Sequence, residues 1–165
     1  MSNEKLRVAI IGCGSLGHVY AKFYSSLPNV KIVALAERNP GRLKHVGKQY
    51  NIRHLYLDAD ALFSDMVPDI AVVVTPSKFY KDSVISAAEA GVRGVSTDKP
   101  LEATLSNADA MVEACAKRGV IFSGGALIKA TPEIQETASW IHKGKLGKLI
   151  GAAVLDWSRE ISGAG

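Results

Sequence analysis

The chain has 165 residues, of which 47% are hydrophobic and 22% charged, with a formal net charge of +4. This length allows one sizeable core and the start of a second unit. The basic residues are scattered, with no dense Lys/Arg run, so we expect a solvated surface and no nucleic-acid partner. No apolar stretch approaches the roughly 18 residues of a bilayer span, so we expect no membrane partner.

The two cysteines and the polar start of the chain bear on its location. Cys13 and Cys115 lie far apart and form no metal-ligand or CxxC spacing, so we expect free thiols and no metal site. Residues 1–7 are polar and lack the apolar segment of a signal peptide. Both features favour a reducing compartment and predict a cytoplasmic protein.

Short apolar runs alternate with helical patterns along the chain. Residues 8–11, 32–36 and 70–74 show no polar alternation, which is typical of parallel strands covered on both faces. Weaker strand signals lie at 54–57, 92–97 and 120–123. Repeated strand–helix–strand units predict an α/β fold with a doubly wound parallel sheet.

The clearest helical patterns lie at residues 77–91 and before Gly119. In the second, the apolar residues fall on one predicted face, and Lys117 and Arg118 precede the glycine as cations do at a helix end. The predicted face is Ala108, Met111, Val112 and Cys115.

The pattern changes after residue 126, so we predict a dinucleotide-binding domain over 1–126 and a second, incomplete α/β domain over 127–165. Thr131 and Pro132 predict a helix start, and Gly144 its end, with a stripe of Ile134, Thr137, Ala138 and Ile141. Residues 149–157 predict a strand. We expect the chain to be truncated there, and the apolar side of Val154 and Trp157 to drive assembly into a homo-oligomer.

A Gly-x-Gly-x-x-Gly sequence joins the first predicted strand to a predicted helix over residues 18–24: Gly12-Cys13-Gly14-Ser15-Leu16-Gly17. In this context Gly12 permits a tight turn, Gly14 admits a pyrophosphate, and Gly17 lets helix and strand pack closely. Phosphates then contact unpaired N–H groups at the helix start, with Ser15 and Leu16 in this segment. The alternative is a plain strand–helix turn.

An acid and a base follow the second predicted strand. Glu37 lies 20 residues after Gly17, where a carboxylate accepts hydrogen bonds from the adenosine ribose and repels a 2′-phosphate, which favours NAD. Arg38 follows directly. A guanidinium there either clamps the 2′-phosphate of NADP or is a solvated loop residue, so NADP stays open.

Two further motifs end apolar strands, where ligands of open α/β sheets bind. Val74-Thr75-Pro76-Ser77 ends one, and Thr97-Asp98-Lys99-Pro100-Leu101 ends the next. With the glycine loop, their order resembles the Gfo/Idh/MocA oxidoreductase family. Its members carry Thr-Pro-Asn-x-x-His after the fourth strand and Glu-Lys-Pro after the fifth. The resemblance covers essentially the whole chain.

This resemblance implies a Rossmann domain and an enzyme that transfers hydride between a nicotinamide cofactor and a CH–OH group of a sugar, cyclitol or related polyol. Thr75, Pro76 and Ser77 match the segment beside the nicotinamide ribose and pyrophosphate. Lys99 matches the family lysine that orients the substrate hydroxyl and helps its proton leave. Pro100 is expected to follow a cis peptide bond. An isolated Asp-Lys-Pro is more often a surface turn.

The sequence also departs from the family. Asp98, assigned to the cofactor site, replaces the usual glutamate. Tyr80 replaces a histidine and either hydrogen-bonds to the cofactor or packs in the core. Lys129 stands alone where members carry arginine and an aromatic residue. The family's second domain supplies a histidine base that none of the chain's histidines matches: His18, His45, His54 and His142.

We therefore expect an oxidoreductase domain that binds cofactor with little or no turnover by itself. The alternative is a dinucleotide-binding sensor or regulatory module without catalysis, which the departures at Asp98 and Tyr80 favour and Lys99 disfavours. A domain that binds S-adenosylmethionine has no use for the Asp-Lys-Pro motif.

Overall fold

A computed structural model describes residues 4–125 and 131–153. The chain forms two compact units, Met1–Ala126 and Leu127–Gly165. Lys129, Val154, Trp157 and the end of the strand predicted over 149–157 lie outside the described residues.

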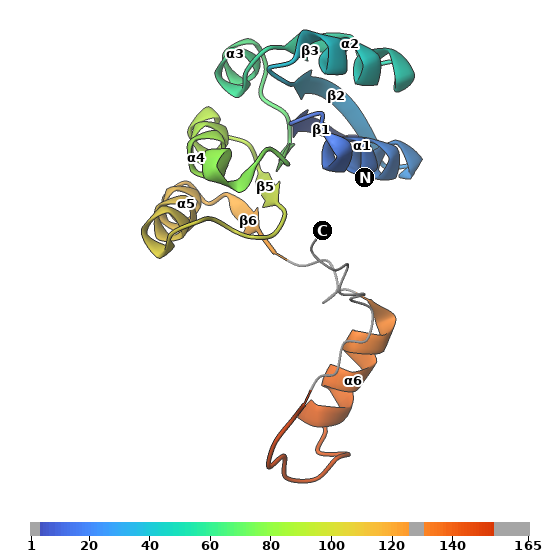
Figure 1. Ribbon diagram of the computed structural model, residues 1–165, viewed down its shortest axis with the longest axis vertical. Coiled ribbons are helices and arrows are strands. Elements are labelled where there is room, and N and C mark those ends of the chain that lie inside the picture. The colour runs from blue at the N-terminus through green and yellow to red at the C-terminus, as the bar shows by residue number, and fades with distance from the viewer. Residues whose placement is uncertain (1–3, 126–130, 154–165) are drawn as a thin grey trace, which may run out of the picture. The chain divides into compact units, whose positions relative to one another are not determined.

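The first unit alternates strands and helices along the chain (Figure 1). Its elements are β1 (Leu6–Ile11), α1 (Ser15–Ser26), β2 (Val30–Ala36), α2 (Pro40–Gln49), β3 (His54–Tyr56), α3 (Ala59–Asp65), β4 (Ile70–Val73), η1 (Ser77–Phe79, a 3₁₀ turn), α4 (Tyr80–Ala90), β5 (Gly94–Thr97), α5 (Leu105–Lys117) and β6 (Ile121–Ser123). Every strand predicted up to residue 123 is confirmed.

The six strands form one parallel sheet in the order β3-β2-β1-β4-β5-β6. This order confirms the predicted doubly wound fold. From β1 the chain first builds outward through β2 and β3, and then returns to place β4 on the other side of β1. The order reverses between β1 and β4, and ligands of such sheets bind at the carboxyl ends of the strands on either side of that point.

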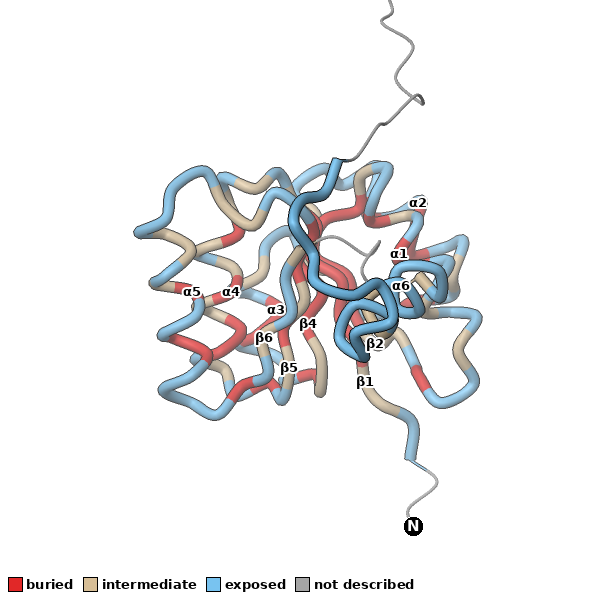
Figure 2. The backbone as a smooth tube through the Cα atoms, turned by 90° about the horizontal axis from the view of Figure 1, so that it is seen from below, coloured by how far each residue is buried: buried red, intermediate tan, exposed pale blue. Residues whose placement is uncertain are grey.

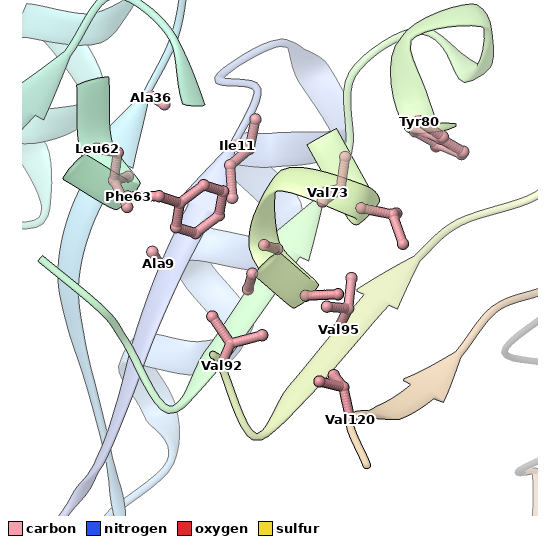
Figure 3. Close-up of a cluster of buried hydrophobic side chains, with 14 of the residues drawn as sticks. Ala9, Ile11, Ala36, Leu62, Phe63, Val73, Tyr80, Val92, Val95 and Val120 are labelled. Carbon is pink, nitrogen blue, oxygen red and sulfur yellow. The ribbon is translucent and has the colours of Figure 1, made fainter. Parts of the chain in front are cut away.

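Both faces of the central strands are buried, which explains their unbroken apolar runs. Val8 and Ile10 belong to the core under α1 and α2, whereas Ala9 and Ile11 face the core under α3, α4 and α5. Figure 3 shows Ile11, Val73 and Val95 from neighbouring strands in this second core. In Figure 2 the buried backbone follows the central strands, and exposed segments lie along the outer turns.

The predicted face of α5 needs one correction. Met111 and Cys115 are buried and Ala108 packs beside them, as predicted, but the Val112 side chain is 49% exposed. The reason is helical geometry, because each residue turns the direction by about 100° and Val112 therefore points away from the face that carries Met111.

The second unit contains α6 (Pro132–His142), preceded by Thr131 and followed by Gly144 with a φ of +67°. These positions confirm the predicted helix and its glycine ending. Residues 149–153, the described part of the predicted strand, have no regular secondary structure. Among the described residues, no helix combines the length and the apolar character that crossing a bilayer requires.

Candidate functional site

A cavity of about 570 Å³ opens at the carboxyl ends of β1, β2 and β4, where the strand order reverses. We call it the carboxyl-edge crevice. It brings together residues from three motifs that are far apart in the sequence. Six of the residues predicted from the sequence line it: Gly12, Gly14, Glu37, Arg38, Thr75 and Pro76.

The three glycines of the loop differ in how much space surrounds them. Gly12 has a φ of +103°, and a Cβ there would lie 2.8 Å from the carbonyl oxygen of Val74. A Cβ on Gly17 would collide with the carbonyl oxygen of Gly12. By contrast, a Cβ on Gly14 would meet no atom within 4 Å. Gly12 and Gly17 are thus fixed by packing, and Gly14 leaves open space at the edge of the crevice.

The start of α1 carries no side-chain cap, and Gly14 is its N-cap residue. The first turn of a helix has N–H groups without partners in the helix, which favour an anion. Ser15 lies outside the carboxyl-edge crevice, in a neighbouring cavity of about 510 Å³ that also reaches His18 and His45. Leu16 is exposed at 36% and lines neither cavity.

The Glu37 side chain is only 8% exposed, and its carboxylate accepts three hydrogen bonds. Its Oε2 accepts from the backbone N–H of Cys13 at 2.8 Å, and its Oε1 accepts from the backbone N–H of Asn39 at 2.8 Å. Arg42 Nη2 donates to the same Oε1 at 2.9 Å. Burial alone raises the pKa of Glu37, but these hydrogen bonds outweigh it, and the pKa lies below its usual value.

Arg42 is a site residue that the sequence reasoning missed. Asn39 accepts a hydrogen bond from the Arg42 N–H and caps α2, and Pro40 takes the first position of the helix. This start places Arg42 in the first turn, facing back toward Glu37. The Asn39-Pro40 pair was the available signal, since asparagine followed by proline is typical of a helix start.

Arg38 and Phe79 meet across the carboxyl-edge crevice, which both residues line. The Arg38 guanidinium carbon lies 4.9 Å from the centre of the Phe79 ring. Arg38 follows β2 and Phe79 ends the 3₁₀ turn after β4, so the contact joins the two walls of the crevice. The flat guanidinium and the ring are surfaces on which a nucleobase can stack. Phe79 was not predicted from the sequence.

Ser77 and Tyr80 lie beyond the crevice lining. Ser77 begins η1, and Tyr80 begins α4 with only 2% of its surface exposed. Tyr80 belongs to the core that Figure 3 shows, together with Val73 and Val95. Tyr80 therefore packs in the core, and its predicted hydrogen bond to the cofactor stays a prediction.

Asp98, Lys99 and Pro100 follow β5, and none of them lines the carboxyl-edge crevice. Asp98 is 9% exposed, Lys99 is exposed, and the Lys99–Pro100 peptide bond is cis, as predicted. Burial, followed by the Asp98 charge, raises the pKa of Tyr80. Since all strands are parallel, Lys99 shares the carboxyl edge with the glycine loop, with β4 between them.

The sequence of residues 6–126 matches an oxidoreductase family with an NAD-binding Rossmann fold. D-apiose dehydrogenase from Paraburkholderia graminis is 31% identical over 144 residues, which is 87% of this chain and 38% of that enzyme. The NAD(+)-dependent scyllo-inositol 2-dehydrogenase from Bacillus subtilis is 30% identical over 89% of this chain and 43% of its own length. The chain therefore spans about two fifths of the length of these relatives.

Solved structures show the same fold. An oxidoreductase from Agrobacterium radiobacter in complex with NAD+, L-tartaric acid and magnesium has a TM-score of 0.81 at 30% identity, over 87% of this chain and 42% of that one. Apo scyllo-inositol dehydrogenase from Lactobacillus casei has a TM-score of 0.83 at 21% identity, over 89% and 44%. The glycine loop, the carboxyl-edge crevice and these matches lead to one conclusion: the chain belongs to the Gfo/Idh/MocA oxidoreductase family, and residues 6–126 form its NAD-binding Rossmann domain.

Proposed function

We propose that this chain is the cofactor-holding part of an NAD-dependent dehydrogenase that oxidises a CH–OH group of a sugar, a cyclitol or a related polyol. The observation that carries the proposal is the hydrogen bond between the Cys13 N–H and Glu37, because it ties the phosphate loop and the ribose acid into one preformed site. The relatives support the substrate class, since two of them are named for D-apiose and scyllo-inositol.

The residues present suit a dinucleotide. Gly14 leaves space where a diphosphate approaches the uncapped start of α1, and Glu37 offers an acceptor for a ribose hydroxyl. A carboxylate has about four acceptor positions, of which three are used here, so roughly one is left for the ribose. The Arg38 guanidinium, which already lies against the Phe79 ring, would offer the adenine a flat surface on which to stack.

Glu37 also supports NAD over NADP. A 2′-phosphate on the adenosine ribose would meet an ionised carboxylate that Cys13 and Asn39 hold in place. Arg38, the residue that would favour NADP, stacks on Phe79 instead. We assign Thr75, Pro76 and Ser77 to the nicotinamide ribose and the pyrophosphate, as in the family.

In the proposed reaction Lys99 orients the substrate hydroxyl and takes part in moving its proton. When bound, the nicotinamide ring supplies the hydride acceptor. Lys99 is exposed at the carboxyl edge of the sheet, where its ammonium group is free to meet a substrate. The buried Asp98 directly precedes it after β5, and we propose it as a positioning residue for the lysine.

A fluorescence titration with NADH and NADPH tests the proposal on this chain and its Glu37→Ala variant. Selective NADH binding that the substitution weakens by about tenfold or more is expected. Glu113→Ala, an exposed acid on α5, is the matched control and leaves the affinity unchanged. Selective NADPH binding, or no binding of either nucleotide, would contradict the assignment.

We also propose that the protein is cytoplasmic and forms a homo-oligomer. The free, buried thiols of Cys13 and Cys115 support a reducing compartment such as the cytoplasm. Homo-oligomer formation is a prediction that light scattering tests, and a monomer at high protein concentration would count against it. We assign the remaining residues, 127–165, to the start of a substrate-binding domain.

A further inference from the structure

Another cavity, of about 520 Å³, opens at the amino-terminal edge of the sheet, opposite to the carboxyl-edge crevice. We call it the amino-edge cavity. Four basic residues line its rim: Arg7 on β1, Lys31 on β2, Arg53 before β3 and His54 at its start. Its apolar lining consists of Ile32, Val33, Ile52 and Met66.

The cavity lies beside the end of α3, where Met66, the C-cap residue of this helix, lines it. This helix has seven residues, and its buried side chains, Leu62 and Phe63, lie beside Ile11 and Ala9 toward the carboxyl half of β1 (Figure 3). Arg7 and Lys31 are register partners on these two strands, so their side chains project from the same face of the sheet.

The charge of this cavity is unbalanced. None of its lining residues is acidic, and among the described residues Arg7, Lys31, Arg53 and His54 make no ion pair. The nearby acid Asp69 accepts from the Arg7 backbone N–H at 2.7 Å and pairs with Arg93 at 3.5 Å. The positive charge of the rim therefore lacks a partner within the described protein.

Arg7 is also held in position. Its Nη1 donates to the Val67 carbonyl oxygen at 2.8 Å, which uses one of the five guanidinium N–H groups. The remaining donors are available to a ligand, in the planar arrangement that suits phosphate and carboxylate. An anchored guanidinium loses less side-chain entropy on binding than a free one does.

We propose that the amino-edge cavity binds a small organic polyanion that carries two or more phosphate or carboxylate groups. Its volume is close to that of the carboxyl-edge crevice and lies within the usual range of ligand pockets, about 300–1,000 Å³. Three permanent cations and a histidine suit a multiply charged ligand, and the apolar lining suits its carbon skeleton. The proposal does not depend on the proposed function, because the two cavities lie at opposite ends of the strands.

The test is a titration of the ¹⁵N-labelled chain with inorganic pyrophosphate, and separately with citrate, at constant ionic strength. Changes in amide chemical shift show which of the two cavities binds the probe. Lys31 and residues 51–54 report binding at the amino edge, and residues 12–17 report binding at the glycine loop. Saturable shifts at the amino edge are expected with at least one probe, and the tighter probe tells phosphate from carboxylate. The double variant Lys31→Gln/Arg53→Gln should weaken this binding by about tenfold or more.

The matched control is Lys22→Gln/Lys44→Gln, which removes the same charge from exposed positions on α1 and α2. It should alter the affinity by less than about twofold. The proposal would be overturned by chemical-shift changes confined to residues 12–17, or by none with either probe. An equal loss of affinity in both double variants would also overturn it. A retained amide spectrum shows that each variant is folded, and Arg7 is left unchanged because it contacts Val67.

Discussion

The backbone N–H of Cys13 donates a 2.8 Å hydrogen bond to Glu37 Oε2, across the carboxyl ends of β1 and β2. Cys13 lies between the first two glycines of the loop, and Glu37 is the acid that follows the next strand. This bond sets the distance between the part of the site that suits phosphate and the part that suits ribose. The site is thus preorganised before a ligand arrives, which lowers the entropy lost on binding.

Replacing Glu37 by glutamine is expected to lower both stability and NADH affinity. The amide keeps one oxygen and turns the other acceptor into a donor, so either Cys13 or the Asn39–Arg42 pair loses its partner. Losing such a buried, charged hydrogen bond costs about 2 kcal/mol, or a fall in Tm of about 4–8 °C for a chain of this size. Thermal unfolding of Glu37→Gln beside Glu113→Gln measures it, and equal Tm values for the two variants would refute the expectation.

The contribution of Glu37 to stability should depend on pH. Its pKa in the folded chain lies below the ordinary value of 4.5. The stabilisation is therefore complete above about pH 4.5 and is lost as the pH falls through the lower, folded pKa. Urea unfolding at pH 7 and at successively lower pH should show the gap between the unmodified chain and Glu37→Gln closing. A gap of constant size would rule this out.

Arg42 should tune the pKa of Glu37 with little effect on stability. Its side chain is 58% exposed, and exposed ion pairs contribute less than about 1 kcal/mol. In Arg42→Gln the Glu37 pKa should rise toward its usual value, because one hydrogen bond and a neighbouring positive charge are removed. Carboxyl ¹³C NMR titration follows this directly, with Lys44→Gln, an exposed neighbour on α2, as the control.

Substitutions at two glycines of the loop should have different effects, one on stability and the other on NADH affinity. Gly12→Ala forces a side chain into a left-handed backbone conformation and against Val74, which should cost about 2–4 kcal/mol. Gly14→Ala has room for its methyl group and should keep the Tm within about 2 °C. The same methyl group occupies the space needed by a diphosphate, so NADH affinity should fall by about tenfold or more. A Gly14→Ala variant that binds NADH normally would contradict the assigned approach.

Cys13 should be unreactive despite its place in the loop. Burial, followed by the Glu37 charge, raises its pKa to about 12. At pH 8 roughly one thiol in 10⁴ is then ionised, and the thiolate is the nucleophile. Ellman's reagent should label the native chain far more slowly than it labels Ser106→Cys, an exposed site on α5. Equal rates would show that the loop opens readily.

Local patterns predicted the elements because each depends on neighbours in the chain. Apolar runs without alternation gave the central strands, and the glycine spacing gave the turn at Gly12 and the tight packing at Gly17. The Gly-x-Gly-x-x-Gly loop and Glu37 could be placed at one edge because parallel strands end together. The same rule placed the motifs at Thr75 and Lys99 at this edge, and the family resemblance supplied their expected roles.

Other features depend on which elements pack together. Val112 points outward because helix rotation, and not hydrophobicity, selects the buried face of α5. Arg42 reaches Glu37 only because α2 turns back over the end of β2. Phe79 meets Arg38 because the strand order sets their two loops on opposite walls of the crevice.

By itself, the amino-acid sequence determined the alternating elements and the place of the glycine loop and Glu37 at one edge of the sheet, since short-range periodicity and spacing encode them. The tertiary structure alone decided the partners of Glu37, the burial of Tyr80 and the amino-edge cavity. The physical reason is that these features arise from contacts between segments distant in sequence. Their geometry is set by strand order, which brings Cys13 and Glu37 together at one edge of the sheet.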